Sequence, residues 1–198
     1  MKKKLLIITG ANGQVGSYLA RSHEGSGDPL LLLYHEDSER VADLRVKKEV
    51  RLKACDLTLF EQTRKAIEDT SRELDAVPAR LIHTAALRSY DAQPLAKSDP
   101  DIFFQVLQTN LMMAYNVLRA CLPDMIANKF GRIVLFGSNV VSTGLRNGAA
   151  YSAAKAGIVN LVKSVALETA NANLLINSIS PAPVESDLEA DYSGDYLK

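Results

Sequence analysis

A tyrosine and a lysine at helical spacing are the residues of this sequence best suited to acid–base chemistry. Tyr151 and Lys155 stand four positions apart in the stretch YSAAK, so on a helix their side chains share one face. An ammonium group beside a phenol lowers the pKa of the phenol and stabilises the phenolate. Because such a pair also arises by chance in a chain of this length, it needs further polar residues near it to indicate a site.

Two polar residues upstream strengthen this interpretation. Ser138 ends the run GRIVLFGS, where the carboxyl end of a strand would place its hydroxyl in a ligand crevice. Asn110 lies inside a long helical pattern, where an amide is a poor core residue unless it bonds a buried group or water. A turn cap at Ser138 and a purely structural amide at Asn110 are the alternatives.

A glycine-rich stretch near the N-terminus indicates a nucleotide site. In ITGANGQVGSYLA an apolar run is followed by Gly10, Gly13 and Gly16, and then by a helical pattern. Glycine allows positive φ and a close approach of the backbone to a pyrophosphate, while the helix that follows offers free N–H groups. The alternative is a glycine turn with a structural role alone.

Apolar runs alternate with helical patterns along the whole chain. Strands are predicted near residues 4–8, 30–34, 50–55, 80–84, 131–137 and 173–179, and helices near 14–24, 38–48, 59–74, 101–127 and 149–170. Continuous apolar strands separated by helices indicate an α/β protein with a doubly wound parallel sheet, covered on both faces. The helices at 101–127 and 149–170 are apolar nearly all round, which predicts a homodimer or homotetramer formed through them.

The composition of the chain limits the kinds of partner that it could bind. The 198 residues fit one domain, and 23 Lys and Arg balance 23 Asp and Glu, so no net field favours nucleic acid. No apolar stretch is long enough to span a bilayer, and the N-terminal run is too short for a secretory signal. We therefore expect a cytoplasmic protein without nucleic-acid or membrane partners.

Cysteines and histidines give no sign of a disulfide or a metal centre. Cys55 and Cys121 stand far apart among apolar residues, as small core side chains would. His23, His35 and His83 share no ligand spacing, so no metal site is expected.

Taken together, the motifs resemble the short-chain dehydrogenase/reductase family over nearly the whole chain, and most of all its 3-oxoacyl-acyl-carrier-protein reductase-like members. The resemblance rests on Thr9-Gly10 with Gly16, Cys55-Asp56-Leu57, Asn110, Ser138, Tyr151 with Lys155, and NSISPAPVES from Asn177. It implies a three-layer Rossmann fold and an NAD(P)-dependent enzyme that interconverts a ketone and a secondary alcohol. The substrate would be a small carbonyl or alcohol compound, with a 3-oxoacyl thioester as the specific expectation.

The resemblance implies a role for each polar residue. Tyr151 would be the general acid or base, and Ser138 would hydrogen-bond the carbonyl oxygen. Lys155 would lower the Tyr151 pKa and bind the nicotinamide ribose, while Asn110 would hold a water that relays protons to Lys155. The cofactor would lie against Gly10, Asn12, Gly13, Gln14, Val15, Gly16, His35, Asp56, Leu57, Thr84, Ala85, Ala86, Tyr151, Lys155, Pro181 and Val184.

The preferred cofactor is predicted from the end of the second strand. Tyr34 or His35 occupies the strand tip, and neither is an acid that would bond the ribose hydroxyls. His35 stands where NADP-using relatives often carry Arg, whereas Glu36 and Asp37 would oppose a 2′-phosphate. We expect a preference for NADP(H), with NAD(H) as the alternative and Arg40 as a helper.

Four departures from the family pattern keep other functions open. The spacing TGANGQVG and the sequence His83-Thr84-Ala85-Ala86 resemble the extended branch, which includes sugar-nucleotide epimerases and dehydratases. Ala182 stands where a glycine is usual. We expect one NAD(P)-binding domain over residues 1–198 that lacks the last helix and strand usual in the family. A non-catalytic dinucleotide-binding protein and an epimerase-like enzyme are therefore the alternatives.

Overall fold

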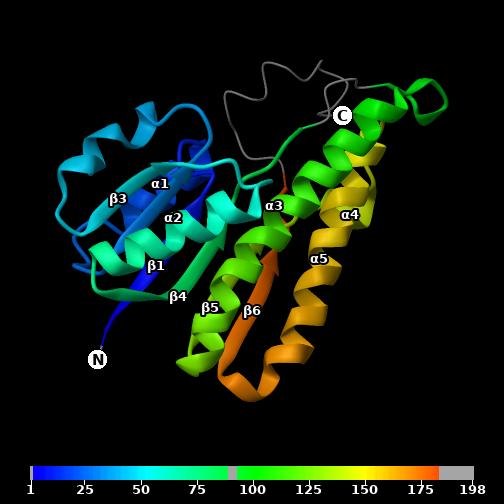
Figure 1. Ribbon diagram of the computed structural model, residues 1–198. Coiled ribbons are helices and arrows are strands. Elements are labelled where there is room, and N and C mark those ends of the chain that lie inside the picture. The colour runs from blue at the N-terminus through cyan, green and yellow to red at the C-terminus, as the bar shows by residue number, and fades with distance from the viewer. Residues whose placement is uncertain (1, 89–92, 183–198) are drawn as a thin grey trace.

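The computed structural model describes residues 2–88 and 93–182, which form a six-stranded parallel sheet with helices on its faces (Figure 1). The strands are β1 (Lys3–Thr9), β2 (Leu30–Tyr34), β3 (Val50–Ala54), β4 (Ala76–His83), β5 (Gly131–Phe136) and β6 (Leu174–Ile179). Their order in the sheet is β3-β2-β1-β4-β5-β6. The strands up to β3 are added on one side of β1 and those from β4 onward on the other, so the order of addition reverses between β1 and β4. In such a sheet ligands bind outside the carboxyl ends of the strands at the reversal point. The predicted Rossmann fold is confirmed.

The helices follow the predicted pattern with one change of type. They are α1 (Gln14–Ser22), α2 (Phe60–Glu73), α3 (Pro100–Ala127), α4 (Val140–Thr143) and α5 (Ala149–Thr169), with the 3₁₀ segments η1 (Glu39–Val46), η2 (Leu95–Lys97) and η3 (Ala170–Ala172). The segment predicted as a helix over 38–48 is the 3₁₀ helix η1. In a 3₁₀ helix residues three apart eclipse one another, and Val41 and Leu44 are both buried under the sheet.

Strand β4 begins earlier than the pattern around 80–84 predicts. It starts at Ala76 and includes Pro78, which has no backbone N–H for a sheet ladder. The pairing of β4 with β1 shifts register between Leu5 and Leu6, beside Pro78. This irregularity lets the strand continue past a residue that would otherwise end it.

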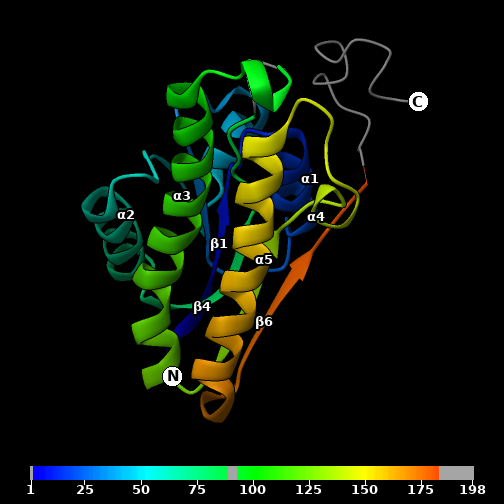
Figure 2. The same cartoon turned by 90° about the vertical axis from the view of Figure 1, so that its right-hand side faces the viewer.

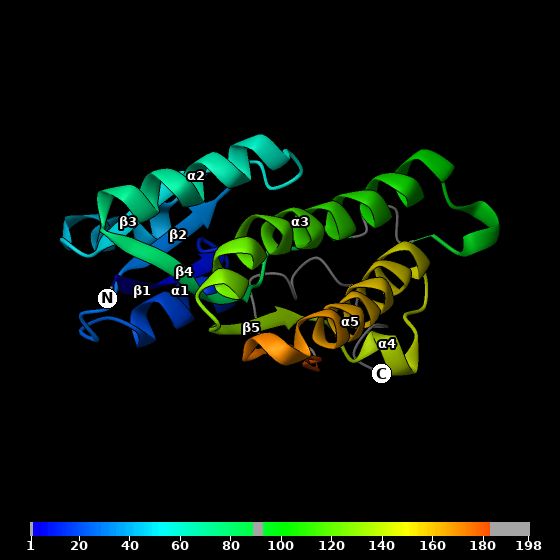
Figure 3. The same ribbon diagram turned by 60° about the horizontal axis from the view of Figure 1, so that its bottom comes forward.

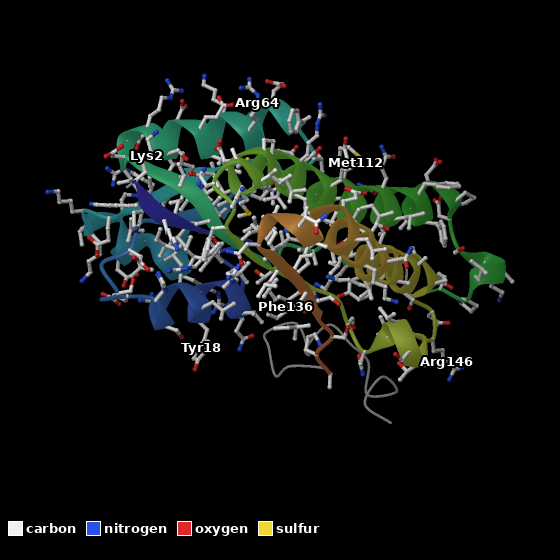
Figure 4. The ribbon with its side chains drawn as sticks, turned by 90° about the horizontal axis from the view of Figure 1, so that it is seen from below. Lys2, Tyr18, Arg64, Met112, Phe136 and Arg146 are labelled. Carbon is white, nitrogen blue, oxygen red and sulfur yellow. The ribbon has the colours of Figure 1, made fainter. Side chains whose placement is uncertain are left out.

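One face of the sheet is covered by α2, α3 and α5, which lie side by side (Figure 3). Their apolar side chains form a core with β1, β2, β4, β5 and β6, from Leu31 on β2 to Ile176 on β6. Figure 2 shows α1 on the opposite side of the sheet. There α1 and η1 pack on β1, β2 and β3 in a second, smaller core. Tyr18 on α1 and Phe136 on β5 lie on this side, away from Arg64 and Met112 (Figure 4).

Both cysteines lie in the interior. Cys55 and Cys121 are free and buried, so their prediction as core side chains is confirmed. Within residues 2–88 and 93–182 no group of three metal-ligating side chains is found. The helices in the same ranges include none that is long and apolar enough to cross a membrane.

Candidate active site

The glycine turn between β1 and α1 is built from close backbone contacts. Gly10 has a φ of +65°, and a Cβ placed there would lie 2.7 Å from the backbone nitrogen of Ala85. A Cβ on Gly16 would lie 2.2 Å from the Gly10 carbonyl oxygen. Gly13 caps α1 without a side-chain hydrogen bond, so N–H groups of the first turn, beginning at Gln14, stay available to an anion. The turn therefore fits a pyrophosphate group.

A polar network joins the glycine turn to the segment after β2. The Asn12 amide Nδ2 donates to Asp37 Oδ2 at 2.8 Å, and Asn12 Oδ1 accepts from the Arg40 backbone N–H at 2.8 Å. Asp37 Oδ1 also accepts from the backbone N–H of Glu39. The Asp37 carboxylate is thus partly satisfied within the protein. His35, the residue after the strand, has an exposed side chain.

The segment after β3 is held by an asparagine that the sequence did not single out. Asp56 accepts hydrogen bonds from the backbone N–H and the hydroxyl of Thr58, and these bonds lower the pKa of its carboxyl. Leu57 is buried. The Asn116 amide on α3 donates to the carbonyl oxygens of Leu57 and Thr58, each at 2.9 Å. Asn116 therefore fixes the backbone that the family resemblance places against the adenine.

The segment after β4 is held in the same way by Asn110. The Asn110 Nδ2 group donates to the carbonyl oxygens of Leu87 and Val106, and Oδ1 accepts from the Leu87 N–H at 3.1 Å. Thr84 contributes a second tie, since its hydroxyl donates to the Thr9 carbonyl oxygen at 2.7 Å. Both hydrogens of the Asn110 amide are thus used by the backbone. Its predicted role in holding a water stays a prediction.

Ser138 lies just beyond the carboxyl end of β5, next to the end of β6. Its hydroxyl is half-buried and accepts a long hydrogen bond of 3.4 Å from the Val140 N–H. The Asn139 N–H donates to the Pro181 carbonyl oxygen at 3.0 Å, which brings the predicted Pro181 beside Ser138. Val184 lies outside the described residues.

The predicted pair on α5 is present, and its lysine is buried. Lys155 has 2% of its surface exposed, and its Nζ donates to the Phe136 carbonyl oxygen at 2.8 Å. The same Nζ lies 5.5 Å from the centroid of the Tyr151 ring. Burial lowers the pKa of Lys155 to about 8, because the charged form loses water around it. A buried cation beside a phenol is the arrangement that stabilises a phenolate.

The sheet topology places the predicted residues around two regions. Gly10, Asn12, Gly13, Gln14, Val15, Gly16, His35, Asp56, Leu57, Thr84, Ala85 and Ala86 follow β1, β2, β3 and β4 or begin α1, while Ser138, Tyr151, Lys155 and Pro181 gather around the ends of β5 and β6. Asn110 lies on α3, which packs against α5. The sequence offered no local signal for Asn116, and it gave His83 no role in the site.

The short chain dehydrogenase family model matches residues 4–196. The chain therefore belongs to the short-chain dehydrogenase/reductase family, and it is an NAD(P)-dependent oxidoreductase that acts on CH–OH or C=O groups.

Two similar proteins are 3-oxoacyl-acyl-carrier-protein reductases. The 3-oxoacyl-acyl-carrier-protein reductase FabG of Rickettsia conorii is 30% identical over 187 residues, which cover 93% of this chain and 74% of the relative. The corresponding reductase MabA of Mycobacterium bovis is 28% identical and covers 92% and 70%.

Solved structures agree on the architecture. An NAD⁺-bound xylitol dehydrogenase superposes with a TM-score of 0.83 at 30% identity, covering 90% of this chain and 70% of that one. A short-chain type dehydrogenase/reductase from Mycobacterium ulcerans gives a TM-score of 0.87 at 20% identity, covering 96% and 71%. The second likeness bears on the fold alone.

Proposed function

We propose that this protein is an NADP(H)-preferring oxidoreductase that interconverts a ketone and a secondary alcohol, with a 3-oxoacyl thioester as its substrate. The observation that carries the proposal is the buried Lys155 ammonium, which donates to the Phe136 carbonyl oxygen and lies 5.5 Å from the centroid of the Tyr151 ring. The choice of thioester is supported by the FabG and MabA relatives, which are 3-oxoacyl-acyl-carrier-protein reductases.

In the proposed mechanism the residues of the chain manage the proton. Tyr151 donates its phenol proton to the carbonyl oxygen in the reductive direction and takes it back in the oxidative direction. The Ser138 hydroxyl donates a hydrogen bond to the same oxygen, where negative charge develops. The Lys155 charge lowers the pKa of Tyr151. When bound in the crevice, the cofactor supplies or accepts the hydride.

The mechanism is tested by removing one hydroxyl. Tyr151→Phe is expected to lower kcat/KM by about 10³-fold, because a positioned proton donor contributes 10²–10⁴-fold. The Kd for NADPH, followed by nicotinamide fluorescence, should stay within about twofold. Tyr18→Phe is the matched control, since Tyr18 is exposed on α1, on the opposite side of the sheet from α5. Its activity should equal that of the unmodified protein.

Other outcomes of this assay separate the alternatives. Cofactor binding without turnover on any 3-oxoacyl thioester or ketone would favour a non-catalytic dinucleotide-binding protein. A nicotinamide that stays bound through purification would favour an epimerase-like enzyme. Turnover that survives Tyr151→Phe would contradict the role given to Tyr151.

The preference for NADP(H) is supported by the surroundings of His35. Its exposed imidazole occupies the strand tip, and the Asp37 carboxylate beyond it is partly satisfied by Asn12. Both features reduce the repulsion that a 2′-phosphate would meet. His35→Asp is expected to lower the NADPH to NADH affinity ratio by about tenfold, because a carboxylate repels the phosphate and bonds the ribose hydroxyls. An unchanged ratio would contradict this assignment.

A homodimer or homotetramer formed through α3 and α5 is the proposed assembly. Both helices expose large apolar side chains, including Phe104, Tyr115 and Leu167, the last of which is 82% exposed. Leu167→Asp should shift the sedimentation coefficient toward that of the monomer. Val46→Asp on η1 is the control, because Val46 is equally exposed but lies on the other side of the sheet. A sedimentation coefficient unchanged by Leu167→Asp would contradict an interface there.

A further inference from the structure

A buried histidine beneath the catalytic helix has one nitrogen that the fold does not satisfy. His83 is the last residue of β4 and is 1% exposed. Its Nδ1 lies 2.8 Å from the Thr9 hydroxyl oxygen. Among the described residues its Nε2 is buried and has no hydrogen-bond partner. Burying a polar atom without a hydrogen-bond partner costs free energy, so the unsatisfied Nε2 atom indicates a functional role.

The sheet places this histidine next to the lysine of the site. Side chains alternate along a strand, so His83 shares with Leu81 the face that α3 and α5 cover. His83 pairs in register with Leu135, and the carbonyl of the following residue, Phe136, accepts the hydrogen bond from Lys155. The imidazole therefore lies at the carboxyl edge of the sheet, on the face that is covered by α5 and its Lys155.

Two titratable groups of the described residues interact with Lys155, namely His83 on β4 and Tyr151 on α5. No carboxylate of the described residues alters the Lys155 pKa, which burial alone lowers. Burial, and then the Lys155 charge, lower the pKa of His83 to about 3. The imidazole is therefore neutral at physiological pH, and one of its nitrogens is an acceptor.

We propose that His83 is a positioning residue for Lys155, whose ammonium it stabilises by accepting a hydrogen bond at Nε2 through one bridging water. In this arrangement the Nδ1–H group donates to the Thr9 hydroxyl, which leaves the Nε2 lone pair directed to the cation. Asn110 has already used both amide hydrogens on the backbone, so it does not compete as a donor. The inference rests on the proposed function, since it gives His83 a part in keeping Lys155 charged beside Tyr151.

Two amide substitutions separate the two nitrogens of the imidazole. In His83→Asn the amide nitrogen replaces Nδ1, so the bond to Thr9 is kept and the Nε2 acceptor is lost. In His83→Gln the amide reaches the Nε2 position, so the acceptor toward Lys155 is kept and the bond to Thr9 is lost. A purely structural histidine would be replaced better by Asn, whereas a positioning histidine would be replaced better by Gln.

The measurement is a ¹³C NMR titration of the lysine Cε resonances of the full chain without cofactor. The Lys155 resonance is identified by its loss in Lys155→Met. We expect His83→Asn to lower the Lys155 pKa by roughly one unit, because a hydrogen bond to the charged form is lost. His83→Gln should leave it within about 0.3 units. A Lys155 pKa unchanged in His83→Asn, or lowered equally in both variants, would overturn the proposal.

Activity gives a second, separate readout. In the active enzyme, the high-pH limb of kcat/KM should move down by roughly one pH unit in His83→Asn and stay in place in His83→Gln. If the unmodified chain reduces no ketone, the proposed function fails. The NMR titration still decides whether His83 holds Lys155, so the two failures are distinguishable.

Discussion

Strands β2 and β6 carry similar apolar residues but meet different surroundings. In β2 the four leucines from Leu30 to Leu33 are all buried, because α1 and η1 cover one face and the larger helical layer covers the other. In β6 Leu174 and Ile176 are buried under α5, whereas Leu175 is 55% exposed. The comparison shows that the apolar residues of a parallel strand are buried on both faces only where helices cover both faces.

The two halves of the sheet also position different groups of predicted site residues. The doubly covered half, β1 to β3, ends in the glycine turn and in the segments expected to bind the cofactor. The other half positions Ser138, Tyr151 and Lys155, and the buried lysine approaches from the α5 side. The buried lysine is therefore placed by the larger core, on the face of the sheet that α2, α3 and α5 cover.

The largest effect on stability is expected for a side-chain truncation on β2. Leu32→Ala is expected to lower the free energy of unfolding by about 3 kcal/mol, because a fully buried leucine leaves a cavity. Leu31→Ala, on the opposite face of the same strand, should cost a similar amount. Urea unfolding of both variants measures this. A loss below about 1 kcal/mol in either variant would mean that the strand is not packed on both faces.

A second test uses pH and the central strand β4. His83 has a folded pKa near 3, below its ordinary value of 6.5, so the unfolded chain binds a proton first as pH falls. Stability is therefore complete above pH 6.5 and decreases on acidification, by up to about 2 kcal/mol between pH 7 and pH 5. His23, whose pKa burial also lowers, contributes in the same range.

The difference between the unmodified chain and His83→Asn isolates the His83 contribution. Urea unfolding at several pH values should give a shallower pH dependence in the variant. Equal slopes in the two proteins would contradict a neutral, buried His83.

The smallest expected effect is on the exposed face of β6. Leu175→Ala should change the free energy of unfolding by about 0.5 kcal/mol or less, because half-exposed side chains lose little on truncation. Ile176→Ala on the covered face of the same strand is the comparison, with an expected loss of about 2 kcal/mol or more. A large effect of Leu175→Ala would show that its face is covered in solution.

The sequence predicted those features of the fold that depend on residues close together in the chain. Six strands and the ends of α1, α2, α3 and α5 follow from apolar runs and helical spacing, and the Tyr151 and Lys155 pair follows from the helix period. The 3₁₀ form of η1 did not follow, since Val41 and Leu44 suit either helix until the sheet is placed. Asn116 could not be found, because its partners Leu57 and Thr58 lie almost sixty positions away.

Helix α3 holds two segments that are predicted to contact the cofactor. Asn110 fixes the backbone after β4, and Asn116 fixes the backbone after β3, from positions six residues apart on one rigid element. Six residues correspond to about 9 Å along a helix, and each added residue would turn one amide by about 100° relative to the other. The interval between these asparagines therefore acts as a spacer that accepts substitutions but not insertions or deletions. Length variation within the family should be tolerated in the loops before and after α3 rather than between positions 110 and 116.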